Sequence, residues 1–569
     1  MGAPPGSQVA PLPSGLPFRL VSKTIGSGAY ASIRKACPLN RPTPIIAVKF
    51  IHKAHAFRTG RLRPKQLQLE VSLHKSVSGH RNVIQFLSHG DDAAWVWMCL
   101  ELADGGDLFD KIEADAGCTE DVAHLFFTQL VNAIEWCHGK GVAHRDIKPE
   151  NMLLSADGDL KLADFGLATQ FALPGRAERK RCGMVCGSPP YIAPEILAVG
   201  QRNAKRKQEG SEAKEGYDPD RADVWSIAIV LFVLLAGNTP WDVPELQQFE
   251  YHAYATSPRD SVPDDELWLK IPATALSLVR GMLSIDPAAR FTLEDVRRHP
   301  WATRANPEMT GDGMVANPLG LATQMMDSMR IDFNAPVSAS QRSTAASNIQ
   351  PATAEVDAMD VDTHTPSATP PVELDHDWEA PPHLPTTLTH PPTHAVTEEA
   401  LLAALEEDPS MSQFSQIAIG SLTATQQARR FHDIAPAHGL ARFYSHYTLP
   451  ALLALLTAAL RDLDIAVPAG PHGTSSAGEG AHQQEDEDGV VRLWITTRDA
   501  RQQSLQGSVV VERVQIGGGG GGWAGAPMEV LEVRFLKAKG DPVGWRRLFK
   551  QVAVLCRDAI PRRREAEGP

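Results

Sequence analysis

The chain has 569 residues, which leaves room for two or three domains of ordinary size. Its formal net charge of −13 argues against direct nucleic-acid binding as the main activity, because an acidic surface repels the phosphate backbone. Hydrophobic residues make up 43% and charged residues 22%, as in ordinary globular proteins. Seven cysteines without a framework spacing predict reduced thiols, and the only close pair, Cys182 and Cys186, is expected to form neither a disulfide nor a metal site.

No export or membrane-spanning segment is predicted. The first 18 residues lack a basic region followed by an apolar core. Gly6 stands where N-myristoylation requires Ser or Thr. The longest apolar run, residues 224–237, is too short to span a bilayer and predicts a buried helix.

Composition divides the chain into four parts, and we expect residues 1–17 to be disordered. Residues 18–301 alternate apolar stretches with turn residues and predict one compact domain. Residues 302–410 are rich in Pro, Ser, Thr and Asp and cannot bury enough apolar surface to offset the entropy of ordering, which predicts a disordered regulatory linker. Residues 411–561 predict a small α+β domain.

This last part contains the patterns of both helices and strands. Helical spacing covers residues 439–467, and a closing amphipathic helix is predicted over 544–560. Strand-like runs lie between them, at 490–498, 507–516 and 528–538. The acidic tract 485–488 and the glycine tract 517–522 are expected to lie in loops. Another hydrophilic stretch, residues 200–216 in the first domain, is expected to form a surface loop.

The stretch "IGSGAYASI", residues 25–33, suggests a loop that holds nucleotide phosphates. Gly26 and Gly28 would let the backbone approach the phosphates, with Ile25 and Ile33 beside the nucleotide. The third glycine of a G-x-G-x-x-G loop is replaced by Ala31. The stretch alone fits an ordinary turn equally well.

The stretch "GVAHRDIKPENMLL", residues 141–154, is the strongest chemical signal. Phosphoryl transfer requires a group that accepts the hydroxyl proton, a cation near the moving phosphate and oxygen ligands for Mg²⁺. Asp146 fits the base, Lys148 the cation and Asn151 a metal ligand. Asp164 of the following "DFG" would be the second metal ligand.

Further motifs complete a constellation. Lys49 in "AVKF" follows the glycine loop and could hold the α- and β-phosphates, and Glu70 on the next predicted helix would be its ion-pair partner. "APE" ends the segment that starts at Asp164. In this order and spacing the motifs resemble the protein kinase family. The resemblance implies a two-lobed α+β fold that uses ATP and Mg²⁺, and because no catalytic group is substituted it implies an active kinase rather than a pseudokinase.

The resemblance also assigns roles outside the catalytic motifs. Leu100 corresponds to the gatekeeper, and the backbone of Glu101 and Ala103 to the hinge that binds adenine. Asp223 resembles the aspartate that supports the catalytic loop. Arg290 resembles the arginine that pairs with the glutamate of "APE", here Glu195.

Several stretches narrow the resemblance to one family. "ELADGGDLFDKIEADAG", "ADFGLATQF", "MVCGSPPYIAPE" and "LLAGNTPWD" are similar to the checkpoint kinase 1 family, and "GLARFYS" and "MEVLEVRFLKAKGDPVGWRRLFKQV" resemble the kinase-associated-1 domain of that family. The resemblance covers both regions expected to be ordered. It implies a serine/threonine kinase of the DNA-damage and replication checkpoint, present in nucleus and cytoplasm.

Three residues bear on the choice of substrate. Ser188 stands where many kinases have threonine and is expected to favour Ser and Thr acceptors. Asp107 and Glu150 match positions where related kinases hold an arginine three residues before the acceptor, and paired carboxylates suit a guanidinium. Alternatively, Asp107 only binds the ribose and Glu150 only completes the catalytic loop.

Regulation is expected near the linker. Ser/Thr-Gln pairs begin at Thr323, Ser340, Ser412, Ser415 and Thr425, and the resemblance makes them candidate targets of upstream DNA-damage kinases. Our hypothesis is that the C-terminal domain docks on the kinase domain and restrains it until phosphorylation weakens the docking.

Two alternatives stay open. One is an energy- or polarity-sensing kinase, and the other is a C-terminal domain that binds acidic membranes through "GWRRLFK". The basic run 202–207 fits either a nuclear-import signal or a solvated charged surface.

Overall fold

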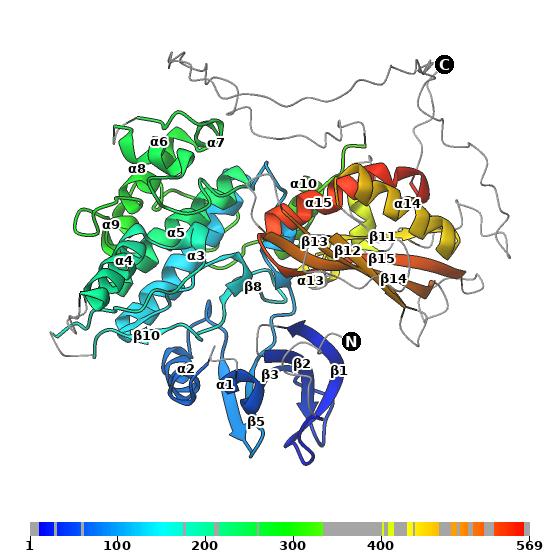
Figure 1. The fold of residues 1–569 in the computed structure, drawn as a ribbon, viewed down its shortest axis with the longest axis horizontal. Helices are drawn as coiled ribbons and strands as arrows, with labels where there is room; N and C mark the ends of the chain where they lie inside the picture. Colours follow the sequence, from blue (N-terminus) through cyan, green and yellow to red (C-terminus); the bar gives the residue numbers. More distant parts are fainter. Residues whose placement is uncertain are drawn as a thin grey trace, which may run out of the picture.

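The structure is a computed structural model, and we describe the residues whose placement is defined. They form a two-lobed unit within residues 11–333 and a C-terminal unit within residues 401–562 (Figure 1). The described residues are 11–27, 31–58, 62–173, 178–209, 215–258, 261–333, 401–402, 405, 408–414, 430–435, 439–465, 480–485, 490–498, 504–516 and 528–562.

The first lobe is an antiparallel sheet with the strand order β1-β2-β3-β5-β4, and α2 accompanies it. Phe50 of β3 is fully buried and packs edge-on against Trp95 of β5. Pro64 opens α2, where its missing N–H costs no helical hydrogen bond. The elements are β1 (Phe18–Ser27), β2 (Ala31–Pro38), β3 (Ile46–His52), α1 (Lys53–Arg58), α2 (Pro64–Val77), β4 (Phe86–Asp91) and β5 (Trp95–Glu101).

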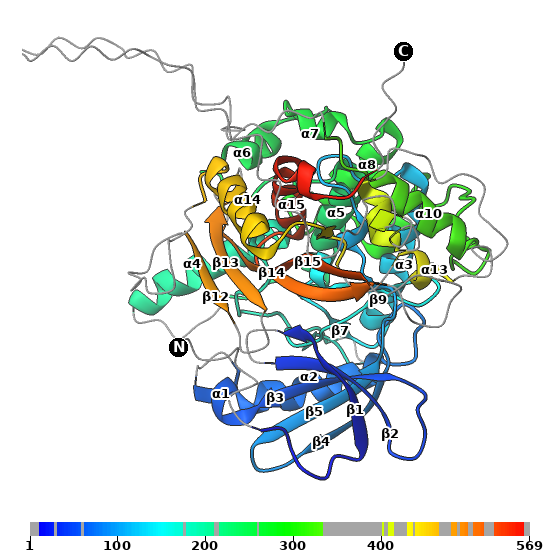
Figure 2. The same ribbon diagram turned by 90° about the vertical axis from the view of Figure 1, so that its right-hand side faces the viewer.

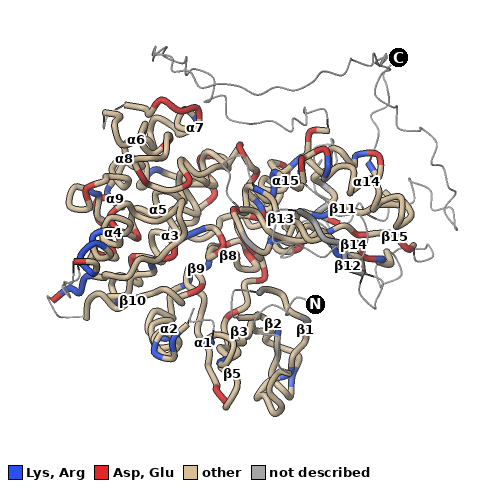
Figure 3. The backbone as a smooth tube through the Cα atoms, viewed as in Figure 1, with Lys and Arg blue, Asp and Glu red and all other residues tan. Residues whose placement is uncertain are grey.

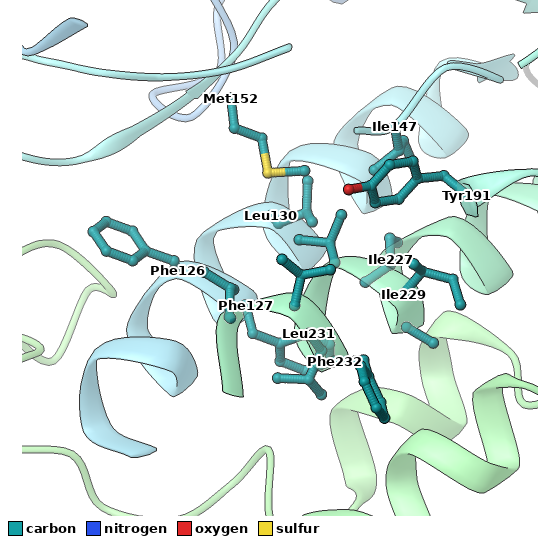
Figure 4. Close-up of a cluster of buried hydrophobic side chains, with 14 of the residues drawn as sticks. Phe126, Phe127, Leu130, Ile147, Met152, Tyr191, Ile227, Ile229, Leu231 and Phe232 are labelled. Atoms are coloured by element: carbon teal, nitrogen blue, oxygen red, sulfur yellow. The ribbon is translucent and has the colours of Figure 1, made fainter. Parts of the chain in front are cut away.

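The second lobe is helical and is built around α3 and α5. Residues 224–236 lie in α5, which is apolar on all sides and buried along nearly its whole length, as the sequence predicted, and Gly237 caps its end in a left-handed conformation. Figure 4 shows side chains of α3, among them Phe127 and Leu130, and of α5, among them Ile227 and Phe232, in this core. The elements are β6 (Gly106–Asp107), α3 (Glu120–Gly139), β7 (Val142–Ala143), β8 (Met152–Leu154), β9 (Leu160–Leu162), β10 (Thr169–Gln170), α4 (Pro194–Gln208), α5 (Pro219–Ala236), α6 (Phe249–Thr256), α7 (Glu266–Leu269), α8 (Ala273–Met282), α9 (Leu293–Arg298), α10 (Pro318–Ser328) and the 3-10 turns η2 (Phe109–Lys111), η3 (Pro149–Asn151) and η4 (Pro189–Tyr191).

The expected surface loop at 200–216 is wrong for its first half, because α4 continues to Gln208. Ala, Lys, Arg and Gln are good helix formers, and Glu215 returns to pair with Arg202 (2.5 Å) and Arg206 (2.6 Å). Figure 3 shows the Lys and Arg residues of α4 as a blue stretch at one edge of the lobe.

The expected start of the linker at residue 302 is too early. The backbone N–H of Val315 donates to Asp159 (2.8 Å), and Gln129 donates to the carbonyl of Gly313 (3.0 Å). Helix α10 then places Leu321, Met325 and other apolar side chains in the second-lobe core. Helical spacing of these residues outweighs the Pro- and Thr-rich surroundings that suggested disorder.

The C-terminal unit is the predicted α+β fold, with a sheet of order β11-β15-β14-β13-β12. Residues 442–445, expected to be helical, form β11 instead, because the helix begins only at Leu449 after Thr448. Strand β12 was not predicted. The elements are η6 (Pro409–Phe414), α13 (Phe431–Ile434), β11 (Arg442–Ser445), α14 (Leu449–Asp462), β12 (Gly480–Glu485), β13 (Val491–Arg498), β14 (Ser504–Ile516), β15 (Met528–Lys539), α15 (Pro542–Leu555) and η7 (Arg557–Ala559).

The core of this unit also reaches beyond its expected start at residue 411. Leu401 and Leu405 are buried in it, together with Ile331 and Phe333 from the end of the segment that follows α10. In the part of the chain that the structure describes, no helix is long and apolar enough to cross a membrane. The glycine tract 517–522 and residues 486–488 of the acidic tract lie outside the described residues.

The two units are in contact, and Figure 2 shows the C-terminal sheet in front of the second lobe. Phe431 and Ile434 of α13 are buried in the second-lobe core. A Cβ atom on Gly158 would lie 2.7 Å from the Phe431 ring, and Gly158 has φ +89°, so glycine alone fits this turn without strain. The backbone N–H of His432 donates to the carbonyl of Ala156 (3.4 Å).

Candidate active site

The loop between β7 and η3 is supported by one buried carboxylate. Asp223 of α5 accepts hydrogen bonds from the backbone N–H groups of His144 (2.9 Å) and Arg145 (2.8 Å). Arg145 has φ +65°, a left-handed conformation that is uncommon for a residue other than glycine. The two bonds therefore stabilise a strained loop and fix the position of the next residue, Asp146.

Asp146 lies at the centre of a hydrogen-bonded cluster. Its carboxylate is 2.8 Å from Nζ of Lys148 and accepts a hydrogen bond from Oγ of Ser188 (3.2 Å). Lys148 also donates to Ser188 (3.1 Å), and Asn151 donates to the backbone carbonyl of Asp146 (2.7 Å). Burial alone lowers the pKa of Lys148, but Asp146 and Glu150 hold it above its ordinary value, so the cation is kept.

Lys49 links the first lobe to this cluster. Its Nζ is 2.8 Å from Oε1 of Glu70 and 2.9 Å from Oδ1 of Asp164. The ion pair expected from the sequence therefore forms, with Glu70 almost fully buried on α2. The Lys49 cation holds the pKa of Asp164 well below its usual range, which keeps this carboxylate ionised at neutral pH.

Asn151 and Asp164 are the residues that would hold a divalent cation. Nδ2 of Asn151 is committed to Asp146, which leaves its amide oxygen as a ligand. No group of three or more His, Cys, Asp and Glu side chains that could hold a metal occurs among the described residues. Two protein oxygens match the way Mg²⁺ binds when nucleotide phosphates and waters supply its other ligands. The residues present therefore fit Mg²⁺ bound together with ATP.

A row of ring contacts that sequence reasoning missed connects the two lobes. His74, four residues after Glu70 on α2, lies 5.5 Å from Phe86 and 4.7 Å from Phe165, measured between ring centroids. Phe165 in turn lies 5.0 Å from His144. Burial lowers the pKa of His74 to about 4, so the ring is neutral at neutral pH. The available signal was an aromatic residue on the same helical face as Glu70 and another directly after Asp164.

The glycine loop is described only at its two ends. Gly26 pairs with Ile33 across β1 and β2, next to Ile25, whereas Gly28 lies outside the described residues. The Ala31 side chain is buried in the first-lobe core with Ile51 and Val96. Its methyl group thus packs inward, which explains physically how the loop accommodates alanine.

Strand β5 ends at the expected hinge. Leu100 packs beside the first-lobe core. Glu101 accepts a hydrogen bond from the backbone of Gln85 (3.0 Å) and pairs with Lys161 (2.5 Å). Because this side chain is committed elsewhere, binding of a base falls to the backbone of residues 101–103.

The expected pair that closes the activation segment also forms. Nη1 and Nη2 of Arg290 lie 2.6 and 2.8 Å from the two carboxylate oxygens of Glu195. Arg290 is almost fully buried against the ring of Trp225. A bidentate, buried pair of this kind fixes the end of the segment that carries Ser188.

Acidic side chains line the surface next to the catalytic loop. Asp107 accepts a hydrogen bond from the backbone of Phe109 (2.8 Å), and burial together with the nearby Asp110 raises its pKa to about 8. Nζ of Lys537, at the end of β15, lies 3.9 Å from Glu150 and is also close enough to Asp107 to oppose that rise in its pKa. Both expected substrate carboxylates therefore lie near one cation of the C-terminal unit.

Acidic residues that follow η2 in the chain contact basic residues of α15. Arg547 makes a bidentate contact with Asp115 (2.5 and 2.8 Å). Lys550 lies 2.8 Å and Arg546 3.6 Å from Glu113. These basic side chains and acidic partners are more than 400 residues apart in sequence, and sequence reasoning did not pair them.

The expected regulatory residues fall in different places. Thr323 is half-buried in α10, where its hydroxyl donates to the carbonyl of Leu319 (2.9 Å). Ser412 lies in η6. Ser340, Ser415 and Thr425 lie outside the described residues. Cys182 and Cys186 are both free.

The cluster around Asp146, the Lys49–Glu70 pair and the two-lobed fold define a protein kinase. Consistent with this, the protein kinase domain family matches residues 20–302.

Similarity to known kinases extends over almost the whole chain. The chain is 35% identical over 539 residues to "Serine/threonine-protein kinase chk1" of Schizosaccharomyces pombe, covering 94% of this chain and 95% of that protein. It is 33% identical over 571 residues to "Serine/threonine-protein kinase CHK1" of Saccharomyces cerevisiae, covering 97% and 99%. In contrast, "CBL-interacting protein kinase 9" of Oryza sativa matches only 49% of this chain, at 36% identity. The chain belongs to the checkpoint kinase 1 family of serine/threonine protein kinases.

Proposed function

We propose that the chain transfers the γ-phosphoryl group of ATP to Ser or Thr of basic protein substrates in the checkpoint response, and that its C-terminal unit restrains this activity. The observation that carries the proposal is the joint placement of Asp146, Lys148 and Ser188 within 3.2 Å of one another, next to the Lys49–Glu70 pair. A base, a cation and a phosphate-binding lysine are the groups that this chemistry requires.

Each residue has a defined task. Asp146 accepts the proton of the substrate hydroxyl as the new bond to phosphorus forms. Lys148 stabilises the negative charge on the moving phosphoryl group, and Lys49, held by Glu70, orients the α- and β-phosphates. When bound, Mg²⁺ at Asn151 and Asp164 neutralises charge on the phosphate oxygens. Ser188 bridges Asp146 and Lys148 and thereby joins the activation segment to the catalytic groups.

We propose that Asp107 and Glu150 select an arginine three residues before the acceptor. Support comes from Lys537, a cation that lies near both carboxylates. A guanidinium at the same place would lower the raised pKa of Asp107, as Lys537 does, and would gain charge-assisted hydrogen bonds to the ionised carboxylates.

Peptides with Arg or Ala at this position test the selection. Glu150→Gln is expected to lower the kcat/KM preference for Arg by roughly tenfold, the size of one such bond. Glu135→Gln, an exposed carboxylate on α3, is the matched control. An unchanged preference in Glu150→Gln would exclude the assignment.

The proposed restraint by the C-terminal unit is supported by the charged residues at the contact between the two units. Lys537 lies near the carboxylates proposed to bind substrate, and Arg547 and Lys550 bind Asp115 and Glu113 beside them. A docked C-terminal unit would thus compete with a basic substrate. Removing residues 411–569 is expected to raise activity on a peptide with Arg at minus three, and unchanged or lower activity would oppose the idea.

The membrane alternative is not favoured. The basic side chains that would bind a membrane lie on α15 and face acidic residues of the kinase unit; they are Arg546, Arg547 and Lys550. The energy-sensing alternative is not favoured either, because the extended similarity is to checkpoint kinases.

We propose a nuclear and cytoplasmic location, with the basic residues 202–207 of α4 as one candidate import signal. Imaging a fluorescent fusion with Lys205→Ala and Lys207→Ala would test that signal.

A further inference from the structure

Strands β8 and β9 form a short hairpin that carries both residues expected to bind Mg²⁺. Asn151 directly precedes β8, and Asp164 follows the end of β9 by two residues. The strands share only three residue pairs, which makes the hairpin roughly 10 Å long. The backbone N–H of Ala163 donates to the carbonyl of Asn151 (2.9 Å) and extends the pairing up to the two ligands. The relative position of Asn151 and Asp164 therefore depends on how this hairpin is held.

The turn at the other end of the hairpin contains a buried carboxylate. Asp159 is 7% exposed, and its Oδ1 accepts hydrogen bonds from Nε2 of Gln129 (2.7 Å) and from the backbone N–H of Val315 (2.8 Å). Gln129 of α3 is fully buried, and its amide oxygen accepts a bond from the backbone N–H of Leu160 (2.7 Å), the first residue of β9. The hairpin is thus tied through its turn to α3 and to the segment that precedes α10.

A segment of the C-terminal unit covers the same turn. The ring of Phe431 in α13 packs on Gly158, and the backbone N–H of His432 donates to the carbonyl of Ala156 (3.4 Å). A turn that only connected two strands would lie in solvent. This turn is instead held by α3, by the segment before α10 and by α13.

Packing alone does not account for Asp159. Burial of a carboxylate costs free energy, and an apolar side chain would fill the same space without that cost. What the carboxylate adds is one oxygen that accepts two N–H bonds and thereby fixes the turn on both partners. Mg²⁺ requires nearly octahedral geometry with oxygen ligands at about 2.1 Å, so a small shift of one ligand weakens its binding.

We propose that Asp159 is a positioning residue for the magnesium site. Together with Gln129 and Val315 it holds the β8–β9 hairpin so that Asn151 and Asp164 can bind one Mg²⁺ together with ATP. The inference rests on the magnesium site proposed above, and Asp159 acts through the hairpin rather than as a ligand. Loss of Asp159 should therefore weaken nucleotide binding only when Mg²⁺ is present.

Calorimetric titration of the full chain with a non-hydrolysable ATP analogue, in Mg²⁺ or in EDTA, measures this effect. The quantity compared is the gain in affinity that Mg²⁺ provides. Asp159→Ala leaves two buried N–H groups without their acceptor, and we expect the gain to fall by roughly tenfold. Its affinity in EDTA should match that of the wild type. Asp159→Asn keeps a carbonyl oxygen for both bonds and should restore the gain.

Two further variants serve as controls. Asp157→Ala makes the same change at an exposed position of the same turn and should keep the wild-type gain. Asp164→Ala removes a proposed ligand and should abolish the gain. A full gain in Asp164→Ala would contradict the proposed magnesium site itself. A gain that is lost in Asp164→Ala but complete in Asp159→Ala would overturn only the role of Asp159.

Equal weakening in Mg²⁺ and in EDTA would also overturn that role, because it would show a general loss of structure in Asp159→Ala. Hydrogen exchange of the wild type needs no variant and decides the question even if Asp159→Ala does not fold. Since coupling between two sites is reciprocal, adding Mg²⁺ to the nucleotide complex should slow exchange of the backbone N–H groups of Leu160 and Val315 by about fivefold. Unchanged exchange at both groups would contradict the proposal.

Discussion

The catalytic centre and the surface between the two units differ in how far apart in sequence their partners lie. Asp146 and Asn151 are five residues apart, and Lys49 and Glu70 are twenty-one residues apart. The spacing of the motifs therefore already indicates which of these side chains contact each other. Arg547 and Asp115 are 432 residues apart, and their pairing depends on how two folded units pack. Even the more distant catalytic partners, such as Lys49 and Asp164 at 115 residues, lie in ordered motifs of one domain. The proposed control instead depends on charge complementarity between two separate units.

The largest expected effect tests the catalytic side of this comparison. Asp146→Asn keeps the shape of the side chain but removes the base, so kcat should fall by about 10²- to 10⁴-fold while the protein stays folded. Steady-state peptide phosphorylation and ATP binding measure the two properties separately. The matched control is Asp157→Asn, the same change at an exposed position of the same lobe. A loss below about tenfold in kcat would contradict the role of Asp146.

The buried ring of His74 is expected to make the stability of the folded chain depend on pH. Its pKa is about 4 in the folded chain and near 6.5 when exposed, so the unfolded chain binds more protons between these values. Stability should therefore fall as the pH decreases from about 6.5 to 4, with a contribution from His74 of about 3 kcal/mol.

Chemical denaturation of the wild type and His74→Leu across this range measures the difference. Their gap in unfolding free energy should shift in favour of His74→Leu as the pH falls, while His252→Leu, at an exposed position, should follow the wild type. Parallel pH dependence in all three chains would show that His74 is not buried as described.

The smallest effect concerns the glycine loop. Ala31→Gly removes a methyl group that packs in the first-lobe core and adds backbone freedom in β2, so the unfolding free energy should drop by roughly 0.5–1 kcal/mol. Because Ala31 stands where such a loop usually has its third glycine, the same variant is expected to bind ATP modestly more tightly, and titration with ATP measures that effect. A stability equal to or above that of the wild type would show that the Ala31 methyl group does not contribute to the core.

The sequence predicted that the kinase-motif residues cluster, and it predicted the two ordered regions and most strands of the second. Motif spacing and hydrophobic periodicity are local properties. It missed the continuation of α4, the packing of 302–333 and strand β12. Charged and Pro-rich composition concealed the first two, and β12 ("GAHQQE") has no alternating apolar pattern. Gln413 is buried and its side chain is hydrogen-bonded to Leu440, Arg442 and Arg546. The sequence could not show this, since a polar residue becomes buried only when several distant groups satisfy it.

A double-mutant cycle on Arg547 and Asp115 tests the central claim most directly. Arg547→Gln and Asp115→Asn each remove one charge of the pair, and asparagine tolerates the positive φ of residue 115. Initial rates on a peptide with Arg at minus three should rise about fivefold in each single variant, with no further rise in the double variant, because both changes break the same contact. Rates that stay at the wild-type value, or effects that multiply in the double variant, would contradict restraint through this pair.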